Sequence, residues 1–414
     1  MMNNSSNELT LRALANTYIN LIGKEDYDEA KRYAEMLCLL APQNIENVHK
    51  LAYIYLKQEK WQDAIDTGLK AISLNNQYVP TLDLLAHAYG AISDWENAGH
   101  YGHQALVLRD AQIPTPTAPM PIGRSVKGGK NLIAFSLFGK RSKYIETAVL
   151  NVQVAHALFP NWICRFYIDD SVPENAVQRL KENGAEIIKI APPLKSWPGA
   201  MWRFLAINDP EAEYVIFRDA DSVISPRESV AVAEWIKSGR SFHTMRDSGS
   251  HTALILAGMW GAKANSVSNM EERIQNYINK EYDSAHFADQ DFLAGELWGY
   301  IRQDLWAHDR LFNFCDAKPF PELPFNSEYQ IAFCEGGAGF IAKTEHKEGT
   351  QVKWTLYSSI SPLLNTDYSP IIVPEFKVCS YQTAVKNGEI ADNIPRRYAY
   401  AFKKGLARIE IENI

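Results

Sequence analysis

Apolar positions follow two different patterns along this chain. Up to residue 112 they recur every three or four positions, which predicts a series of amphipathic helices. From residue 131 onward, short apolar runs alternate with helical patterns, which predicts strands and helices in turn. Between them, segment 113–130 carries four prolines followed by a pair of glycines. Because proline removes a backbone donor and restricts φ, we expect this segment to be a linker.

The helical part repeats itself. Aromatic residues recur every 34 positions, at Tyr27, Trp61 and Trp95, and small residues do the same at Ala30, Ala64 and Ala98. A 34-residue period of paired helices is the sequence pattern of tetratricopeptide repeats. We therefore predict an all-α repeat domain over 1–112, with these aromatic residues packed between helices. Such an array typically holds a partner protein or a second copy of its own chain, and the sequence does not decide between them.

The second part reads as an α/β domain. The apolar runs predict strands at 131–139, 162–170, 185–190 and 213–218, and the helical patterns fall at 144–159, 172–184 and 198–209. Alternation of this kind predicts a mainly parallel sheet covered by helices on both faces. Ligands of such sheets bind beyond the carboxyl ends of the strands.

Size, charge and cysteine content narrow the class of protein. A chain of 414 residues is long enough for two or three domains. Its 42 basic and 49 acidic residues give a net charge of −7, which argues against a general nucleic-acid binder. The five cysteines are scattered and the N-terminus lacks a signal-peptide pattern. We expect reduced thiols and a cytoplasmic protein, with peripheral contact at the inner face of a membrane left open.

Two carboxylates follow the strand predicted at 213–218, in the stretch EYVIFRDADS. In an extended chain, residues i and i+2 point the same way, so Asp219 and Asp221 are expected to converge on one target. Hard divalent cations take oxygen ligands and complete their shell with substrate phosphates, which favours Mn²⁺ or Mg²⁺ at this position. The alternative is that both aspartates are ordinary turn residues.

The sequence VIFRDADS resembles the Asp-x-Asp motif of GT-A glycosyltransferases. FSLFGKRSKYIETAVLNVQ, RFYIDDSVP, WRFLAINDP and the LAGMWG and DQDFL stretches resemble bacterial transferases of the capsule and lipopolysaccharide type, over roughly residues 131–320. The resemblance implies a Rossmann-like GT-A domain over 131–350, and a C-terminal extension, 351–414, packed on it. It also implies a nucleotide-diphosphate sugar, with UDP expected, and a glycan, lipid-linked or protein acceptor.

The resemblance implies a role for each matching residue. Nucleotide-sugar contacts would come from Ser136, Tyr144, Asp169, Arg203 and Asp219, with Arg203 facing the diphosphate. Gly258 and Trp260 would shape the sugar pocket. Asp219 and Asp221 would hold the metal, completed by His308 or His346. Asp289 or Asp291 would act as the base on the acceptor side if the reaction inverts the anomeric carbon.

Each of these residues also has a structural explanation. Asp169 and Asp289 suit helix caps or turns, Trp260 suits a core, and a lone histidine is usually structural. The basic tail sequence IPRRYAYAFKKGLARIEI fits either a helix at a membrane surface or a solvated helix packed on the domain. Two other functions stay open at this point: an inactive scaffold that binds through its repeats, and a sugar nucleotidyltransferase.

Overall fold

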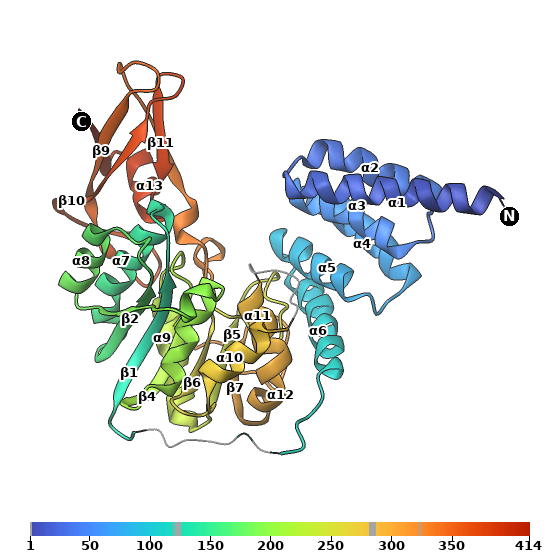
Figure 1. Ribbon diagram of the computed structural model, residues 1–414, viewed down its shortest axis with the longest axis horizontal. Coiled ribbons are helices and arrows are strands. Elements are labelled where there is room, and N and C mark those ends of the chain that lie inside the picture. The colour runs from blue at the N-terminus through green and yellow to red at the C-terminus, as the bar shows by residue number, and fades with distance from the viewer. Residues whose placement is uncertain (1, 119, 121–125, 281–286, 322, 324) are drawn as a thin grey trace. The chain divides into compact units, whose positions relative to one another are not determined.

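The computed structural model describes residues 2–118, 120, 126–280, 287–321, 323 and 325–414 (Figure 1). Residues 119 and 121–125 of the predicted linker therefore lie outside the described residues. The chain forms two compact units. The first unit contains residues 1–114, 246–254 and 309–319, and the second contains 115–245, 255–308 and 320–414.

Six helices form the repeat region of the first unit (Figure 1). They are α1 (Met2–Gly23), α2 (Tyr27–Leu40), α3 (Ile45–Lys57), α4 (Trp61–Leu74), α5 (Val79–Ala91) and α6 (Trp95–Gln112). The 34-residue period extends to the backbone, because the left-handed conformation recurs at Glu25, Glu59 and Ser93 (φ 58°, 56° and 63°). Ala30, Ala64 and Ala98 are fully buried. The prediction of a helical repeat region is confirmed.

Two segments from later in the chain complete this first unit. Residues 246–254 and 309–319 pack on α5 and α6, where glycines allow the backbones to approach. A Cβ on Gly102 would lie 2.2 Å from the Phe312 ring. The Arg310 guanidinium stacks 4.1 Å from the centre of the Trp95 ring. These segments cover the last repeat, which would otherwise leave part of its packing surface open to water.

The second unit contains a seven-stranded sheet in the order β3-β2-β1-β4-β6-β5-β7. Its strands are β1 (Lys130–Leu137), β2 (Trp162–Ile168), β3 (Glu186–Lys189), β4 (Ala212–Arg218), β5 (Phe242–Arg246), β6 (Trp260–Lys263) and β7 (Leu305–Asp309). The pairs β3–β2, β2–β1 and β1–β4 are parallel, whereas β6 is antiparallel to β4 and to β5. The predicted α/β architecture with a mainly parallel central sheet is confirmed.

Helices pack on this sheet and form a hydrophobic core together with it. They include α7 (Ser142–Leu158), α8 (Glu174–Glu182), α9 (Pro226–Ser238), α10 (Met270–Ile278), α11 (Ala288–Phe292) and α12 (Trp298–Ile301), with a π-helical turn at Leu293–Leu297 between the last two. The Phe135 and Phe166 rings stack across the β1–β2 pair with their centroids 4.7 Å apart. The apolar core beneath α7 therefore fixes the strand ends from which the site residues emerge.

The helix predicted at 198–209 forms with 3₁₀ winding. Residues 198–209 contain a 3₁₀-helix, η2 (Gly199–Asn208). Its turns are held by tertiary partners: the Arg203 backbone amide donates to Ser136 Oγ (3.0 Å), and Trp202 Nε1 donates to the Leu194 carbonyl (2.9 Å). An apolar pattern does not distinguish α from 3₁₀ winding when such partners come from other elements.

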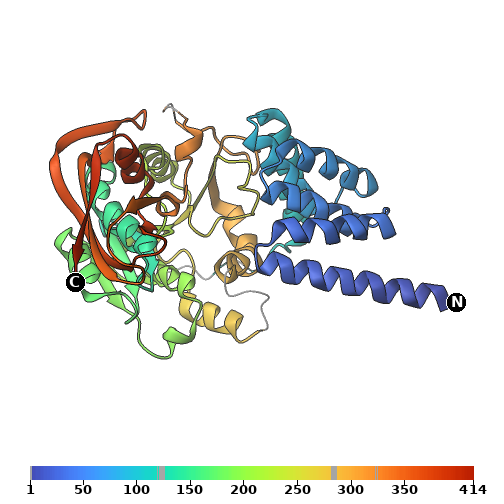
Figure 2. The same cartoon turned by 90° about the horizontal axis from the view of Figure 1, so that it is seen from above.

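The C-terminal residues form two small sheets (Figure 2). β9 (Gln351–Leu364) lies between β10 (Pro370–Ala384) and β12 (Ala407–Asn413), while β8 (Gly339–Lys343) pairs with β11 (Glu389–Asn393). The tail helix α13 (Arg396–Lys403) packs on β9 and β12, and its Arg397 is buried against Glu335. Among the described residues, no helix has both the length and the apolar character required to span a bilayer.

Candidate active site

Arg203 joins two carboxylates that are far apart in the sequence. Its Nη1 donates to Asp219 Oδ1 at 2.7 Å, and its Nη2 donates to Asp289 Oδ2 at 2.8 Å. Arg203 is only 2% exposed, whereas 45% of the Asp219 side chain is exposed. Among the described residues, the buried Nε of Arg203 has no hydrogen-bond partner. A buried guanidinium thus lies behind a carboxylate that faces solvent.

Two local features hold Arg203 and Asp219 in place. Ser136, near the end of β1, accepts from the Arg203 amide and donates to the Ala200 carbonyl (3.2 Å), which fixes η2 against the sheet. Gly258 lies directly beside Asp219, since a Cβ at that position would be 2.0 Å from Asp219 Oδ2. Gly258 is needed at this position because only a residue without a side chain leaves room for that carboxylate.

Asp221 has partners of its own. Its Oδ2 lies 3.3 Å from Lys143 Nζ, and Cys334 Sγ donates to the same oxygen at 3.3 Å. Its backbone carbonyl accepts from Gly336 N at 3.0 Å. The expected convergence of Asp219 and Asp221 on one target stays a prediction, because β4 ends at Arg218 and the chain turns at the next residues. The alternation of an extended strand no longer applies there.

Burial shapes the charge states around these carboxylates. It raises the pKa of Asp289, an effect that Arg203 opposes and the like charge of Asp219 adds to. Burial also raises the pKa of the Cys334 thiol to about 11, and the neighbouring Asp221 carboxylate adds to this increase. The Cys334 thiol therefore stays protonated near neutral pH and acts as a weak donor to Asp221. Asp289 holds protons more strongly than an ordinary aspartate.

A buried ion pair between Arg218 and Glu228 supports the site. Arg218, the last residue of β4, donates from Nε to Glu228 Oε2 at 2.7 Å, and its carbonyl accepts from Arg203 Nη1 at 3.3 Å. Both side chains of the Arg218–Glu228 pair are 2% exposed. Because burying a charge without a partner is costly, this pair ties the end of β4 to α9 and so fixes the turn that carries Asp219.

Three further predicted residues have other local surroundings. Tyr144 is half-buried on α7 and packs against the core, and Asp291 is exposed in the first turn of α11. Asp169 closes a local turn, with its Oδ1 accepting from Ser171 N at 3.0 Å.

Trp260 and His308 are corrections to the predicted site. Trp260 is fully buried in β6, with its ring stacked 4.3 Å from that of Phe217, so it offers no face to a sugar. His308 Nδ1 lies 2.8 Å from His243 Nε2, and its Nε2 lies 3.1 Å from Glu234 Oε2. Position along the sequence could not reveal that both residues are fully buried.

Sequence reasoning missed three residues that the fold brings to the site: Lys143, Glu228 and Cys334. Lys143 belongs to the basic stretch after β1, and it is the only one with a sequence signal. Glu228 and Cys334 contact Arg218 and Asp221 through tertiary structure alone. The sequence could not predict the contact between Cys334 and Asp221, because 113 positions separate them.

The predicted metal ligands are the two carboxylates that follow β4. Asp219 and Asp221 provide the hard oxygen donors that Mn²⁺ or Mg²⁺ prefers. Among the described residues, no group of three or more histidine, cysteine or acidic side chains is placed to hold a metal ion. A cation at this site would therefore take its remaining ligands from substrate oxygens and water.

Comparisons with known proteins give limited information. No family model matches the chain, and no curated protein matches it. A T3SS complex from Aeromonas hydrophila is 22% identical, with a TM-score of 0.26, and the match covers 27% of this chain and 74% of that one. The first tetratricopeptide repeat domain of Spaghetti, bound to an HSP90 peptide, is 21% identical, with a TM-score of 0.23, covering 24% of this chain and 78% of that one.

A match to an O-GlcNAc transferase mutant from Thermobaculum terrenum extends further along the chain. It covers 45% of this chain and 42% of that one, at 16% identity and a TM-score of 0.26. At these scores none of the three neighbours defines the function of this chain.

Proposed function

We propose that this protein is a glycosyltransferase that moves a sugar from a nucleoside-diphosphate sugar, with UDP the expected nucleotide, to an acceptor hydroxyl. The acceptor is a glycan, a lipid-linked glycan or a protein. The observation that carries the proposal is the Asp219–Arg203–Asp289 arrangement, placed where parallel strand β4 ends. Sheets of this kind bind ligands at that edge.

Arg203 is proposed to lie on the diphosphate side of the reaction. Its guanidinium is permanently charged, but its two terminal nitrogens donate to Asp219 and Asp289 and the residue is 2% exposed. In this proposal Arg203 therefore holds the two carboxylates in fixed positions. Lys143, whose side chain is 22% exposed, supplies positive charge to the diphosphate. Charged groups that are already oriented stabilise negative charge on a leaving group without reorganising.

A divalent cation, Mn²⁺ or Mg²⁺, is part of the proposal. Asp219 and Asp221 would hold it, and when bound it would supply Lewis-acid stabilisation of the departing diphosphate. Lys143 already balances the charge of Asp221 at 3.3 Å. The protein's own cations therefore offset part of the repulsion between the carboxylates before any metal binds.

Asp289 is the proposed base if the reaction inverts the anomeric carbon. A general base works best when its pKa lies closer to the working pH, and burial moves the pKa of Asp289 in that direction. Its bond to Arg203 sets the orientation of its carboxylate. In a retaining reaction no such base is required, and Asp289 would then only position Arg203.

The repeats are proposed to recruit a partner protein or to mediate self-association. Their stacked helical hairpins offer the kind of extended surface on which repeat arrays bind other chains. Pull-down with residues 1–110, compared with the full chain, tests for a partner, and light scattering tests for self-association.

The decisive experiment measures hydrolysis of UDP-sugars and GDP-sugars with Mn²⁺, with Mg²⁺ and with EDTA. We expect metal-dependent hydrolysis in the wild type and its loss in Asp219→Asn. Asp170→Asn is the matched control, because Asp170 is exposed and pairs with Lys195 away from the cluster. Turnover that is unaffected by EDTA would remove the metal from the proposal. No turnover with any donor would leave the repeat-based scaffold as the better description.

A further inference from the structure

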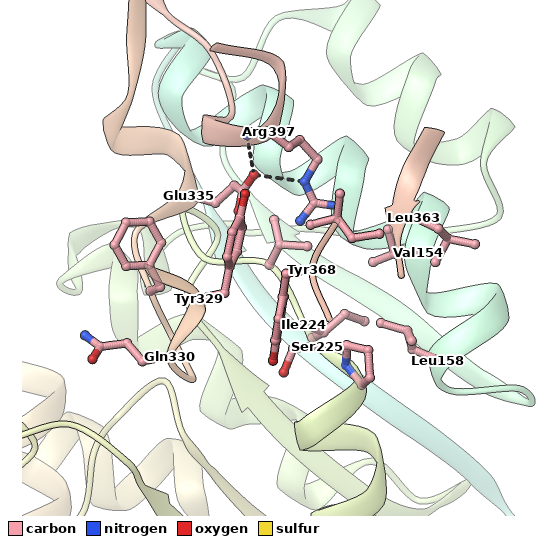
Figure 3. Close-up of a pocket in the computed structure, with 14 residues that line it drawn as sticks. Val154, Leu158, Ile224, Ser225, Tyr329, Gln330, Glu335, Leu363, Tyr368 and Arg397 are labelled. Carbon is pink, nitrogen blue, oxygen red and sulfur yellow. Dashed lines mark hydrogen bonds and ion pairs between the residues drawn. The ribbon is translucent and has the colours of Figure 1, made fainter. Parts of the chain in front are cut away.

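Two neighbouring cavities in the second unit share a wall made by a pair of tyrosines. The larger cavity has a volume of about 240 Å³ and the smaller about 40 Å³ (Figure 3 shows the smaller). Tyr329 and Tyr368 line both, with rings stacked at a centroid distance of 5.0 Å and an angle of 10°. Arg397 also lines both cavities. We call the larger one the tyrosine cavity.

The tyrosine cavity combines aromatic faces with hydrogen-bonding groups. Tyr400, which lines it, is 50% exposed. Its polar lining residues are Asn326, Glu328, Asp367 and Ser369, together with Arg397. Hydrogen bonds from Ser369 lower the pKa of Asp367, so this carboxylate is a charged acceptor at neutral pH. The lining of this cavity thus combines aromatic rings with carboxylate and amide groups.

The charge balance of the cavity disfavours an anionic ligand. Arg397 donates to Glu335 Oε1 from both its Nε (2.8 Å) and its backbone nitrogen (3.0 Å), so its charge is already balanced (Figure 3). Glu328 and Asp367 add negative charge to the wall. A phosphate or a uronate would meet these carboxylates, and Arg397, the one basic residue among the described residues that line the cavity, is already paired with Glu335. The polar residues equally disfavour a hydrocarbon chain, because binding one would remove their water.

We propose that the tyrosine cavity binds a neutral hexopyranose ring of the glycan acceptor. A pyranose has a weakly polar face that packs on aromatic rings and a rim of hydroxyls that donate to carboxylates. Calling this sugar the acceptor rests on the proposed function, whereas the binding of a neutral sugar does not. Among the acceptors considered above, this inference favours a glycan.

The chain links this cavity to Asp221. Tyr329 belongs to η5 (Ser327–Tyr329), and Glu335 begins η6 (Glu335–Gly337). Cys334, just before η6, donates to the Asp221 carboxylate, and Gly336 N, within η6, donates to the Asp221 carbonyl. A sugar that orders the 326–337 segment would therefore also hold Asp221 in place.

The test is titration of the full chain with methyl glucoside, methyl galactoside, methyl mannoside and their disaccharides, followed by calorimetry and saturation-transfer NMR. We expect saturable binding of at least one glycoside. Tyr400→Ala and Asp367→Asn should each weaken it at least tenfold. Tyr357→Ala is the matched control, because Tyr357 lies on β9 against Arg408 and does not line the cavity. Absence of binding, or unchanged affinity in both cavity variants, would overturn the inference.

Further titrations separate a neutral sugar from other ligands, and the tyrosine cavity inference from the proposed function. If methyl glucuronide or a decyl chain binds more tightly than the neutral glycosides, the tyrosine cavity inference is also overturned. UDP with Mn²⁺ is titrated in parallel. UDP binding without glycoside binding overturns the tyrosine cavity inference alone. Glycoside binding without UDP binding or donor turnover overturns the proposed function and leaves a sugar-binding site.

Discussion

Gly258 and Asp219 are in such close contact that no other residue fits at position 258 without moving the carboxylate. A Cβ there would lie 2.0 Å from Asp219 Oδ2 and 2.6 Å from Cγ. Asp219 cannot simply rotate away, because its other oxygen is bonded to Arg203 at 2.7 Å. The backbone of one loop thus determines where a solvent-facing carboxylate stands.

Gly258→Ala should therefore lower the rate of donor turnover with little loss of fold. We expect kcat/KM to fall at least about tenfold, which corresponds to about 1.4 kcal/mol of transition-state stabilisation. Gly295→Ala is the matched control, because a Cβ at that position meets nothing within 4 Å. Equal activity of the two variants would show that the position of Asp219 does not matter for turnover.

Asp221→Ala should abolish turnover while the melting temperature changes little. Asp221 is partly exposed, with 23% of its side chain accessible, and its pair with Lys143 contributes only a modest stabilisation. The measurement is donor hydrolysis together with thermal unfolding. A large fall in melting temperature would instead assign Asp221 a structural role in holding the 334–336 segment.

Removing Arg203 should destabilise the second unit. Arg203→Ala leaves Asp289, whose side chain is 10% exposed, without its cation. Breaking a buried pair from one side costs about 3–5 kcal/mol. Urea unfolding measures this loss. In the double variant Arg203→Ala, Asp289→Asn much of the stability should return, because no buried charge remains. A double variant as unstable as the single one would contradict this account.

The stability contributed by Asp289 should depend on pH. Burial raises the pKa of Asp289 above its ordinary value of 3.8. At pH values between the ordinary and the raised pKa, Asp289 therefore binds more protons in the folded state than in the unfolded state. Its contribution is therefore most favourable at low pH and declines as the pH rises through this window. We expect the free energy of unfolding of the wild type, minus that of Asp289→Asn, to fall over the same range. The corresponding difference for Asp170→Asn should rise with pH, since Lys195 lowers the pKa of Asp170.

Gly102→Leu should destabilise the first unit. Even a Cβ at this position would lie 2.2 Å from the Phe312 ring, so the larger side chain forces α6 and the 309–319 segment apart. Overpacking of this kind costs about 1–3 kcal/mol. Hydrogen exchange should show faster exchange in both segments. Gly23→Ala, where nothing lies within 4 Å, should leave exchange there unchanged.

Much of the fold could be predicted from local pattern. The 34-residue spacing of Tyr27, Trp61 and Trp95 places them at the first residue of α2, α4 and α6. The four predicted strands all form, because short apolar runs between turn residues are strong local signals. The winding of η2 could not be predicted, since Ser136 and Leu194 hold it from other elements.

The sequence by itself determined the repeat period, the α/β order and the acidic turn after β4, because each depends on neighbours a few residues away. Only the tertiary structure decided which charges meet. Arg203 and Asp289 are 86 positions apart, and Asp221 and Cys334 are 113 apart. It also placed Trp260 in the core and His308 beside His243. A side chain's partner is set by packing across the whole fold, and a local pattern carries no information about elements that lie far along the chain.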